Sequence, residues 1–215
     1  MTLRMIPRKT ALMGLLASLA LVSAARAQTP LDTYLSHLKT LRAEFAQTVT
    51  DGKGEQVQNA QGTLVIVRPG RFRWELTPDG GSPQLMVADG KNLWFYDRDL
   101  DQVSVKPAAA ALTATPASLL SGDGKLDEFF DVRAAGQRDG LSWVRVVPKR
   151  SDADFREVQI GFKGKDELSR MVLKDKLGQT VRLEFNVSTR NVPVADAEVK
   201  FTPPAGADVI GTPVP

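Results

Sequence analysis

The sequence contains no cysteine and a single histidine, and both scarcities restrict what the protein can do. Without cysteine the chain forms no disulfide, so the hydrophobic core alone must hold the fold. His37 is predicted on a helix and has no cysteine to pair with it, which removes a cysteine–histidine nucleophile from consideration. The sequence also has no glycine-rich phosphate-binding loop, so we expect no nucleotide hydrolysis.

Long apolar runs are absent as well. No stretch approaches the roughly 20 apolar residues that a membrane-spanning helix needs. The uncharged apolar stretch 11–22 follows basic residues at positions 4–9 and precedes Ala-Arg-Ala at 25–27, a small-x-small cleavage pattern. This arrangement is typical of a secretory signal peptide. We therefore predict a signal peptide over residues 1–27 and a single exported, periplasmic domain over residues 28–215.

The excess of positive charge is small and lies mostly in the predicted signal peptide. That segment holds Arg4, Arg8, Lys9 and Arg26 of the 28 lysines and arginines, and none of the 25 aspartates and glutamates. The remaining chain is close to neutral and slightly negative. The basic isoelectric point therefore gives no argument for nucleic-acid binding.

A short helix is predicted at the start of the mature chain. Apolar residues at positions 31, 34, 35 and 38 follow the spacing of one helix face, and Pro30 suits a first helical turn.

From Leu41 onward the apolar period changes to two, which is typical of strands. Turn signals such as Asp51-Gly52, Asp89-Gly90 and Asp139-Gly140 separate short segments, so neighbouring strands should be antiparallel. We predict a mainly β fold in which one antiparallel sheet of about 10–11 strands curls into an incomplete barrel. The predicted strands are 41–46, 62–68, 71–76, 84–88, 91–96, 102–106, 130–134, 141–147, 155–162, 168–174 and 179–187.

One segment, residues 107–129, interrupts the strands. It is rich in alanine, and Thr115-Pro116 reads as the cap and first residue of a helix that continues to Leu119 and Leu120. Together with the N-terminal helix, this segment is predicted to form a lid over the open side of the curled sheet.

Two strands are apolar on both faces, 64–67 and 93–96, so something must cover the second face. One interpretation is that the helices cover it permanently, as part of an ordinary core. The other is that the cover is mobile and that the space beneath it admits an apolar ligand.

Arg68 bears on this choice, because it follows Leu64 and Ile66 in one row and ends the strand beside Pro69. Its guanidinium needs acceptors, and the free carbonyls at a helix C-terminus would supply them. It is either a latch between strand and lid or a surface arginine whose stem covers apolar area.

Four motifs together resemble the periplasmic outer-membrane lipoprotein carrier family, LolA. They are F-x-Q-x-V-x-D-G at 45–52, R-P-x-x-F-x-W at 68–74, D-G-x-x-L-W-F-Y at 89–96 and F-x-P-P-x-G at 201–206. The resemblance runs from about Leu31 to Ile210.

The resemblance implies an incomplete antiparallel barrel closed by a lid of short helices, and a monomeric carrier without enzymatic activity, cofactor, metal or nucleic-acid partner. Such a carrier accepts lipid-modified proteins from an ATP-driven inner-membrane transporter and holds their acyl chains under the lid. It then passes them to an outer-membrane lipoprotein receptor, where one is present.

The resemblance also assigns roles to residues. It implies that Arg68 bonds to the lid in the closed state, although Ala117 and Ser118 stand where bulkier apolar groups are expected in the lid. The lid residues are Leu112, Leu119 and Leu120. The residues expected to line the acyl-chain cavity are Leu64, Ile66, Phe72, Trp74, Met86, Trp94, Tyr96, Val158 and Ile160.

Other functions have weaker support in the sequence. An enzyme would have to rely on His37 or on the D-x-D-x-D run at Asp97, Asp99 and Asp101, which lacks the glycine and distal glutamate of a calcium loop. A periplasmic sensor or lipid-binding protein of the same curled-sheet fold remains an alternative, and so does a carrier that inserts its own cargo at the outer membrane. A membrane-anchored receptor would normally need an N-terminal cysteine, and a plain scaffold would need no cavity.

Overall fold

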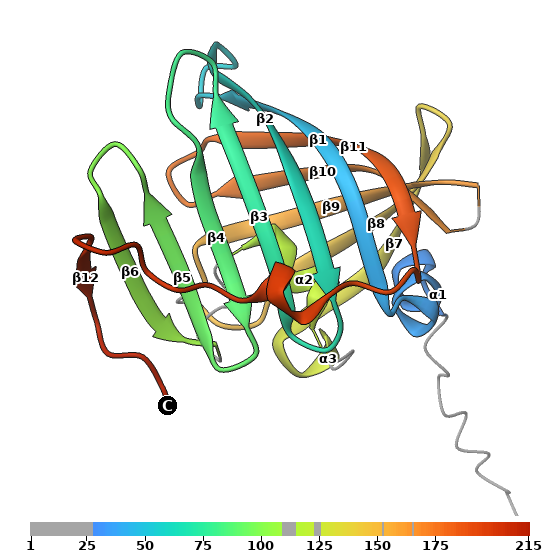
Figure 1. Cartoon of the computed structure of the whole chain (residues 1–215). Helices are drawn as coiled ribbons and strands as arrows, with labels where there is room; N and C mark the ends of the chain where they lie inside the picture. The colour runs from blue at the N-terminus through green and yellow to red at the C-terminus, as the bar shows by residue number, and fades with distance from the viewer. Residues whose placement is uncertain (1–27, 109–114, 123–125, 152, 165) are drawn as a thin grey trace, which may run out of the picture.

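The computed structural model describes residues 28–108, 115–122, 126–151, 153–164 and 166–215. Within these residues twelve strands form one sheet, and short helices accompany it (Figure 1). The helices are α1 (Pro30–His37), α2 (Pro116–Ser121), α3 (Leu126–Phe129) and the 3-10 helix η2 (Asp196–Val199). The strands are β1 (Thr40–Thr50), β2 (Gln56–Val67), β3 (Arg71–Pro78), β4 (Gln84–Asp89), β5 (Asn92–Asp97), β6 (Gln102–Pro107), β7 (Phe130–Arg138), β8 (Leu141–Pro148), β9 (Phe155–Lys163), β10 (Glu167–Asp175), β11 (Thr180–Arg190) and β12 (Asp208–Ile210).

The sheet is open rather than closed. Its strands follow the order β12-β6-β5-β4-β3-β2-β1-β11-β10-β9-β8-β7, and in the described chain the end strands β12 and β7 do not pair with each other. Every pair is antiparallel except β12 with β6. Figure 1 shows the sheet curling so that β7–β10 pass behind β1–β4. This confirms the predicted mainly β fold with an incomplete antiparallel barrel.

Helices α1, α2 and α3 lie on the concave side of the sheet. In Figure 1, α2 and α3 lie behind β2 and β3, and α1 lies beside the lower end of β1. α2 contacts β2 and β3, α3 contacts β7, and α1 contacts β8. Within the described residues, no helix has the length and apolar character needed to cross a membrane. The predicted signal peptide, residues 1–27, lies outside the described residues.

Each predicted strand appears in the structure, but two features differ from the prediction. β2 begins at Gln56 rather than at Gly62, because residues 56–61 are mostly polar and exposed and so carry no alternation. β12 was not predicted, because its three residues are all exposed and show no apolar alternation.

The main core fills the concave side. Apolar side chains at alternate positions of the strands meet the buried faces of α1, α2 and α3 there. From the helices come Leu31, Tyr34, Leu35, Ala117, Leu119, Leu120 and Leu126, among others.

A second, smaller core covers the outer face of β4–β6. Leu85, Val87, Trp94, Val103 and Val105 are buried there. The cover is the C-terminal segment after β11, which packs Phe201 and Ala207 on this cluster, with Phe201 5.7 Å from Trp94 between ring centroids. Strand β5, which is apolar on both faces, therefore packs against the main core on one side and against the C-terminal segment on the other.

Ion pairs fix the C-terminal segment across the outer face. In η2, Glu198 accepts two hydrogen bonds from Arg42, at 2.5 and 2.8 Å, and Asp196 accepts one from Arg71 at 2.8 Å. Val199 is fully buried against the sheet. Figure 1 shows this segment crossing in front of β2–β4.

Candidate functional site

Both helices of the lid begin with sequence-encoded caps. Thr29 and Asp32 form a capping box at the start of α1, and Thr115 accepts a hydrogen bond from the Ser118 backbone at the start of α2. Such caps matter here because α1 and α2 have only eight and six residues, too few to be stable as isolated helices.

Arg68 ties the ends of these helices to the sheet. Its Nε donates to the carbonyl of Gly122, the C-cap of α2, at 2.9 Å, and its Nη1 donates to the carbonyl of Leu35 in the last turn of α1. The backbone continues the connection, because the N–H of Gly70 donates to the carbonyl of Ser121 at 2.7 Å.

The chemistry of this contact follows from the helix ends. The last carbonyls of a helix lack intrahelical partners and carry partial negative charge, so a cation there is stabilised. Arg68 is half-buried, and one guanidinium with several fixed donors can bridge two helices. Arg68 thus connects both α1 and α2 to the end of β2 through hydrogen bonds.

An apolar cavity of about 320 Å³ lies on the concave side, between the two arms of the curled sheet. One wall is formed by Trp74 and its cross-strand partner Met86, on β3 and β4. The opposite wall contains Leu173 and its partner Val181, on β10 and β11. The remaining lining residues are Gln47, Leu76, Thr115, Asp154, Phe155 and Asp175.

Trp74 is held in this wall by aromatic packing. The Phe45 ring lies 4.2 Å from Trp74 between centroids, and it covers the position where Gly62 has no side chain. A Cβ at Gly62 would lie 2.3 Å from the Phe45 ring and 2.2 Å from the carbonyl oxygen of Glu75. Glycine is therefore required for the ring to take this place.

The nine predicted cavity residues fall into three groups: two line the cavity, five are buried beside it in the main core, and two face away from it. Trp74 and Met86 line the cavity directly. Five others are fully buried in the main core, where they pack with the lid: Leu64, Ile66, Phe72, Val158 and Ile160.

The prediction that Trp94 and Tyr96 line the cavity is wrong. They belong to the outer cluster, against Phe201, and so face away from the cavity. The residues of β5 that share the inner face are Leu93 and Phe95, since side chains alternate along a strand. Because this strand is apolar on both faces, alternation alone does not identify the inner one.

Asp89 fixes Trp94 in the outer cluster. Its carboxylate accepts a hydrogen bond from Trp94 Nε1 at 2.8 Å and others from the backbone N–H groups of Lys91 and Asn92. Burial by itself would raise the pKa of Asp89, but these hydrogen bonds outweigh it and lower that pKa below its ordinary value.

Sequence reasoning missed several cavity residues. Leu76 continues the row of Phe72 and Trp74, so its position was available from the pattern. Phe155, Leu173 and Val181 lie on distant strands, and only the curl of the sheet brings them opposite Trp74.

Of the residues predicted to form the lid, Leu119 and Leu120 are fully buried in the main core. Leu112 lies outside the described residues. Ala117 and Ser118 are also buried, and the Ser118 hydroxyl donates to the Thr115 carbonyl at 2.5 Å within its own helix. Small side chains at these positions let α2 lie close to β2 and β3.

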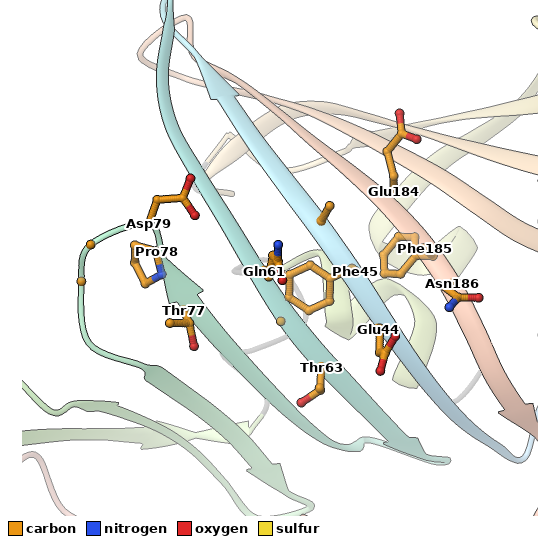
Figure 2. A pocket seen from close by; sticks show the side chains of 14 residues that line it. Glu44, Phe45, Gln61, Thr63, Thr77, Pro78, Asp79, Glu184, Phe185 and Asn186 are labelled. Carbon is orange, nitrogen blue, oxygen red and sulfur yellow. The ribbon is translucent and has the colours of Figure 1, made fainter.

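A larger hollow, of about 920 Å³, lies on the outer face of β1, β2, β3 and β11. Figure 2 shows polar side chains along it, including Glu44, Gln61, Thr63 and Glu184. A wide, polar hollow of this kind does not remove an acyl chain from water, so size does not make it the better candidate.

The residues considered for an enzyme, His37 and Asp97, make contacts within their own helix or turn. His37 Nδ1 lies 2.9 Å from the Thr33 carbonyl and 3.2 Å from the Ser36 hydroxyl, on the exposed end of α1. Asp97 accepts backbone hydrogen bonds from Asp99 and Leu100, as a turn residue does. Among the described residues, no group of three or more acidic or histidine side chains is placed to hold a metal.

Comparison with known proteins now identifies the family. Residues 36–202 match the family model described as outer membrane lipoprotein carrier protein LolA. The chain belongs to the LolA family. It is 43% identical over 195 residues to the outer-membrane lipoprotein carrier protein of Dechloromonas aromatica (strain RCB), which covers 91% of this chain and 92% of that protein.

A second relative matches over nearly the whole length. The outer-membrane lipoprotein carrier protein of Bordetella pertussis (strain Tohama I) is 37% identical over 213 residues, covering 97% of this chain and 99% of that protein. Among solved structures, an uncharacterized conserved protein from Thermus thermophilus has a similar fold. Its TM-score is 0.54 at 16% identity, and the match covers 84% of this chain and 96% of that one.

Proposed function

We propose that this LolA-family protein is a periplasmic carrier that holds the acyl chains of lipid-modified proteins and delivers them to the outer membrane. The observation that carries the proposal is the tie between Arg68 and both lid helices, directly beside an apolar interior. The family relationship supports it, because relatives at about 40% identity are named outer-membrane lipoprotein carrier proteins. A carrier of this kind catalyses no reaction.

The small size of the cavity supports opening of the lid on loading. At about 320 Å³ it lies at the lower end of the range of ligand pockets. Each buried methylene stabilises a bound acyl chain by about 0.8 kcal/mol, so longer or several chains gain by displacing α2 from the core beneath it, while α1 stays in place. Leu119 and Leu120 then leave the space that the chains enter.

Arg68 sets the cost of this opening. A hydrogen bond from a charged donor contributes about 1.5–3 kcal/mol to stability. Its contribution lies toward the lower end of this range where solvent can replace the lost acceptor. Because Arg68 is half-buried, the loss of its hydrogen bonds disfavours lid opening only moderately. Burial of an acyl chain offsets this free-energy cost. A closed lid without cargo and an open lid with cargo are thus both stable.

The direction of transfer then depends on the partners. We propose that an ATP-driven inner-membrane transporter loads the carrier and that an outer-membrane receptor, or the membrane itself, takes over the acyl chains. A receptor that binds these chains more tightly accepts them without nucleotide hydrolysis by the carrier. The carrier is proposed to work as a monomer, exported by the signal peptide at residues 1–27.

The proposal is tested by isolating the protein from the periplasm and identifying bound acylated proteins by mass spectrometry. Arg68→Leu removes both side-chain hydrogen bonds to the lid. Arg68→Lys keeps the charge but loses the planar guanidinium that bonds both helices at once. Arg73→Leu is the matched control, because Arg73 pairs with Glu75 on the sheet and not with the lid.

We expect acylated proteins on the wild type and the control, more of them retained on Arg68→Leu, and an intermediate amount on Arg68→Lys. If a folded Arg68→Leu protein retains the same amount of acylated protein as the control does, the latch is refuted. If none of the proteins carries acylated cargo but free lipid is bound, the alternative of a periplasmic lipid-binding protein replaces the carrier.

A further inference from the structure

The pairing between β10 and β11 stops halfway along β11. The two strands pair from Lys174↔Thr180 to Arg170↔Glu184. β11 continues to Arg190 and stays paired with β1 on its other side. Figure 1 shows β10 and β11 separating toward the end near α1.

A cleft of about 420 Å³ lies where the strands separate. Its walls are residues 185–190 of β11 and residues 166–168 at the start of β10, and the Tyr34 side chain of α1 completes the lining. At its far end Arg190 donates to both the carboxylate and the backbone carbonyl of Asp166, each at 2.9 Å. The cleft is therefore a defined gap in the sheet.

Tyr34 brings an unpaired donor to this cleft. Its side chain is 1% exposed, and its hydroxyl is buried without any hydrogen-bond partner among the described residues. The ring is held in place by Phe162, 5.3 Å away between centroids, and by the Arg190 guanidinium, 5.7 Å from the ring centroid. Leaving a buried hydroxyl unpaired is costly, so a ligand acceptor at this point would be favoured.

The rest of the lining is suited to a ligand that is partly apolar. Phe185 and Val187 occupy inner-face positions of β11 and are half-buried, in the part of the strand that is not paired with β10. Burial raises the pKa of the Tyr34 hydroxyl well above its ordinary value, so this group stays protonated and able to donate. The cleft thus offers apolar contact and one hydrogen-bond donor.

The cleft and the acyl cavity share the inner face of β11. Val181 lines the cavity, Leu183 is fully buried, and Phe185 lines the cleft. Four residues of a strand span about 13 Å, so a ligand with its tails in the cavity can place its head in the cleft.

We propose that the cleft between β10 and β11 binds the carbonyl-bearing head of an acylated ligand, with the Tyr34 hydroxyl donating to a carbonyl oxygen. This inference rests on the proposed carrier function. The acceptor chemistry is shared by two groups of such a ligand: the ester of its diacylglyceryl unit and the first amide of the polypeptide that follows.

The test compares Tyr34→Phe with Tyr96→Phe. Tyr96 is the matched control because its hydroxyl bonds Asp101 on the outer face, away from both cavity and cleft. The probes are a short synthetic peptide with a dipalmitoylglyceryl group on its N-terminal cysteine, dipalmitoylglycerol, and the same peptide without acyl chains. Affinities are measured together with the thermal midpoint of each unliganded protein.

We expect Tyr34→Phe to weaken binding of the lipopeptide by about two- to tenfold, the range of one neutral hydrogen bond, while Tyr96→Phe has no effect. The unliganded midpoint should stay equal or rise, because the substitution removes an unpaired buried hydroxyl. If dipalmitoylglycerol is weakened as well, the acceptor is the ester; if only the lipopeptide is weakened, it is the peptide amide. The unacylated peptide should not bind.

Equal affinity of the lipopeptide for both variants would overturn the inference and leave the carrier function intact. Failure of every acylated probe to bind either variant would overturn the carrier function itself. Hydrogen exchange of the wild type is a second readout that needs no variant: lipopeptide should slow exchange at residues 185–190, and unchanged exchange there contradicts the proposal.

Discussion

Replacing Gly62 with alanine is expected to disturb the cavity wall, because no room exists for a methyl group there. The new Cβ would lie 2.2 Å from the Glu75 carbonyl oxygen and 2.3 Å from the Phe45 ring, both far inside van der Waals contact. The carbonyl belongs to the neighbouring strand and cannot rotate away, so the backbone must shift. The Phe45 ring must also move against Trp74, which it already contacts at 4.2 Å.

The expected cost is that of an overpacked core, about 1–3 kcal/mol. For a protein of this size each kcal/mol lowers the thermal midpoint by about 2–4 °C, so Gly62→Ala should lower it by roughly 2–12 °C in a scanning-calorimetry measurement. Gly81→Ala is the matched control, because a Cβ there meets only Pro78 at 3.4 Å or more, and its φ is not positive.

A double-mutant cycle with Phe45→Leu assigns the effect to the ring. The cost of Gly62→Ala should be smaller in the Phe45→Leu background, with the remainder due to the Glu75 carbonyl. If Gly62→Ala unfolds at the wild-type temperature, the close packing of Phe45 over Gly62 is wrong, and so is the placement of Trp74 in the wall.

Two further predictions concern the outer face. Phe201→Ala should lower the free energy of unfolding by about 1–2 kcal/mol, less than for a fully buried phenylalanine because Phe201 is only partly buried, and it should leave acyl-chain affinity unchanged; urea titration and lipopeptide binding would check both. The pKa of Asp89 is depressed in the fold, so its contribution to stability is present above the ordinary carboxyl pKa of about 3.9 and is lost as the pH falls through the folded value. Asp89→Asn should therefore destabilise the protein at pH 7 and make little difference at the acid end, whereas an equal loss at both pH values would contradict this linkage.

The contacts of Arg68 could be anticipated because they depend on short-range rules. Its position in the row of Leu64 and Ile66 follows from strand alternation, and its need for acceptors follows from its chemistry. Helix ends supply such acceptors wherever a lid closes, and the structure places Leu35 and Gly122 there.

The face occupied by Trp94 could not be predicted in the same way. Both faces of β5 are apolar, and the residue that separates them, Phe201, is about a hundred positions further along the chain in a segment without periodicity. The cleft beside β11 depends on a similarly non-local fact, the point at which β10 stops pairing. Neither the face that Trp94 occupies nor the end of the β10–β11 pairing can be predicted from a local sequence pattern.

The junction of β1 with β11 has a consequence for the order in which the protein folds. These strands meet in the middle of the sheet, and they join two meanders, β2–β6 and β7–β10, that can each pair locally. The first strand must wait for residues 180–190 before the two halves can join. A chain with such a late, long-range closure folds slowly. The two halves of the sheet can therefore join only after residues 180–190 have been synthesised, when most of the chain already exists.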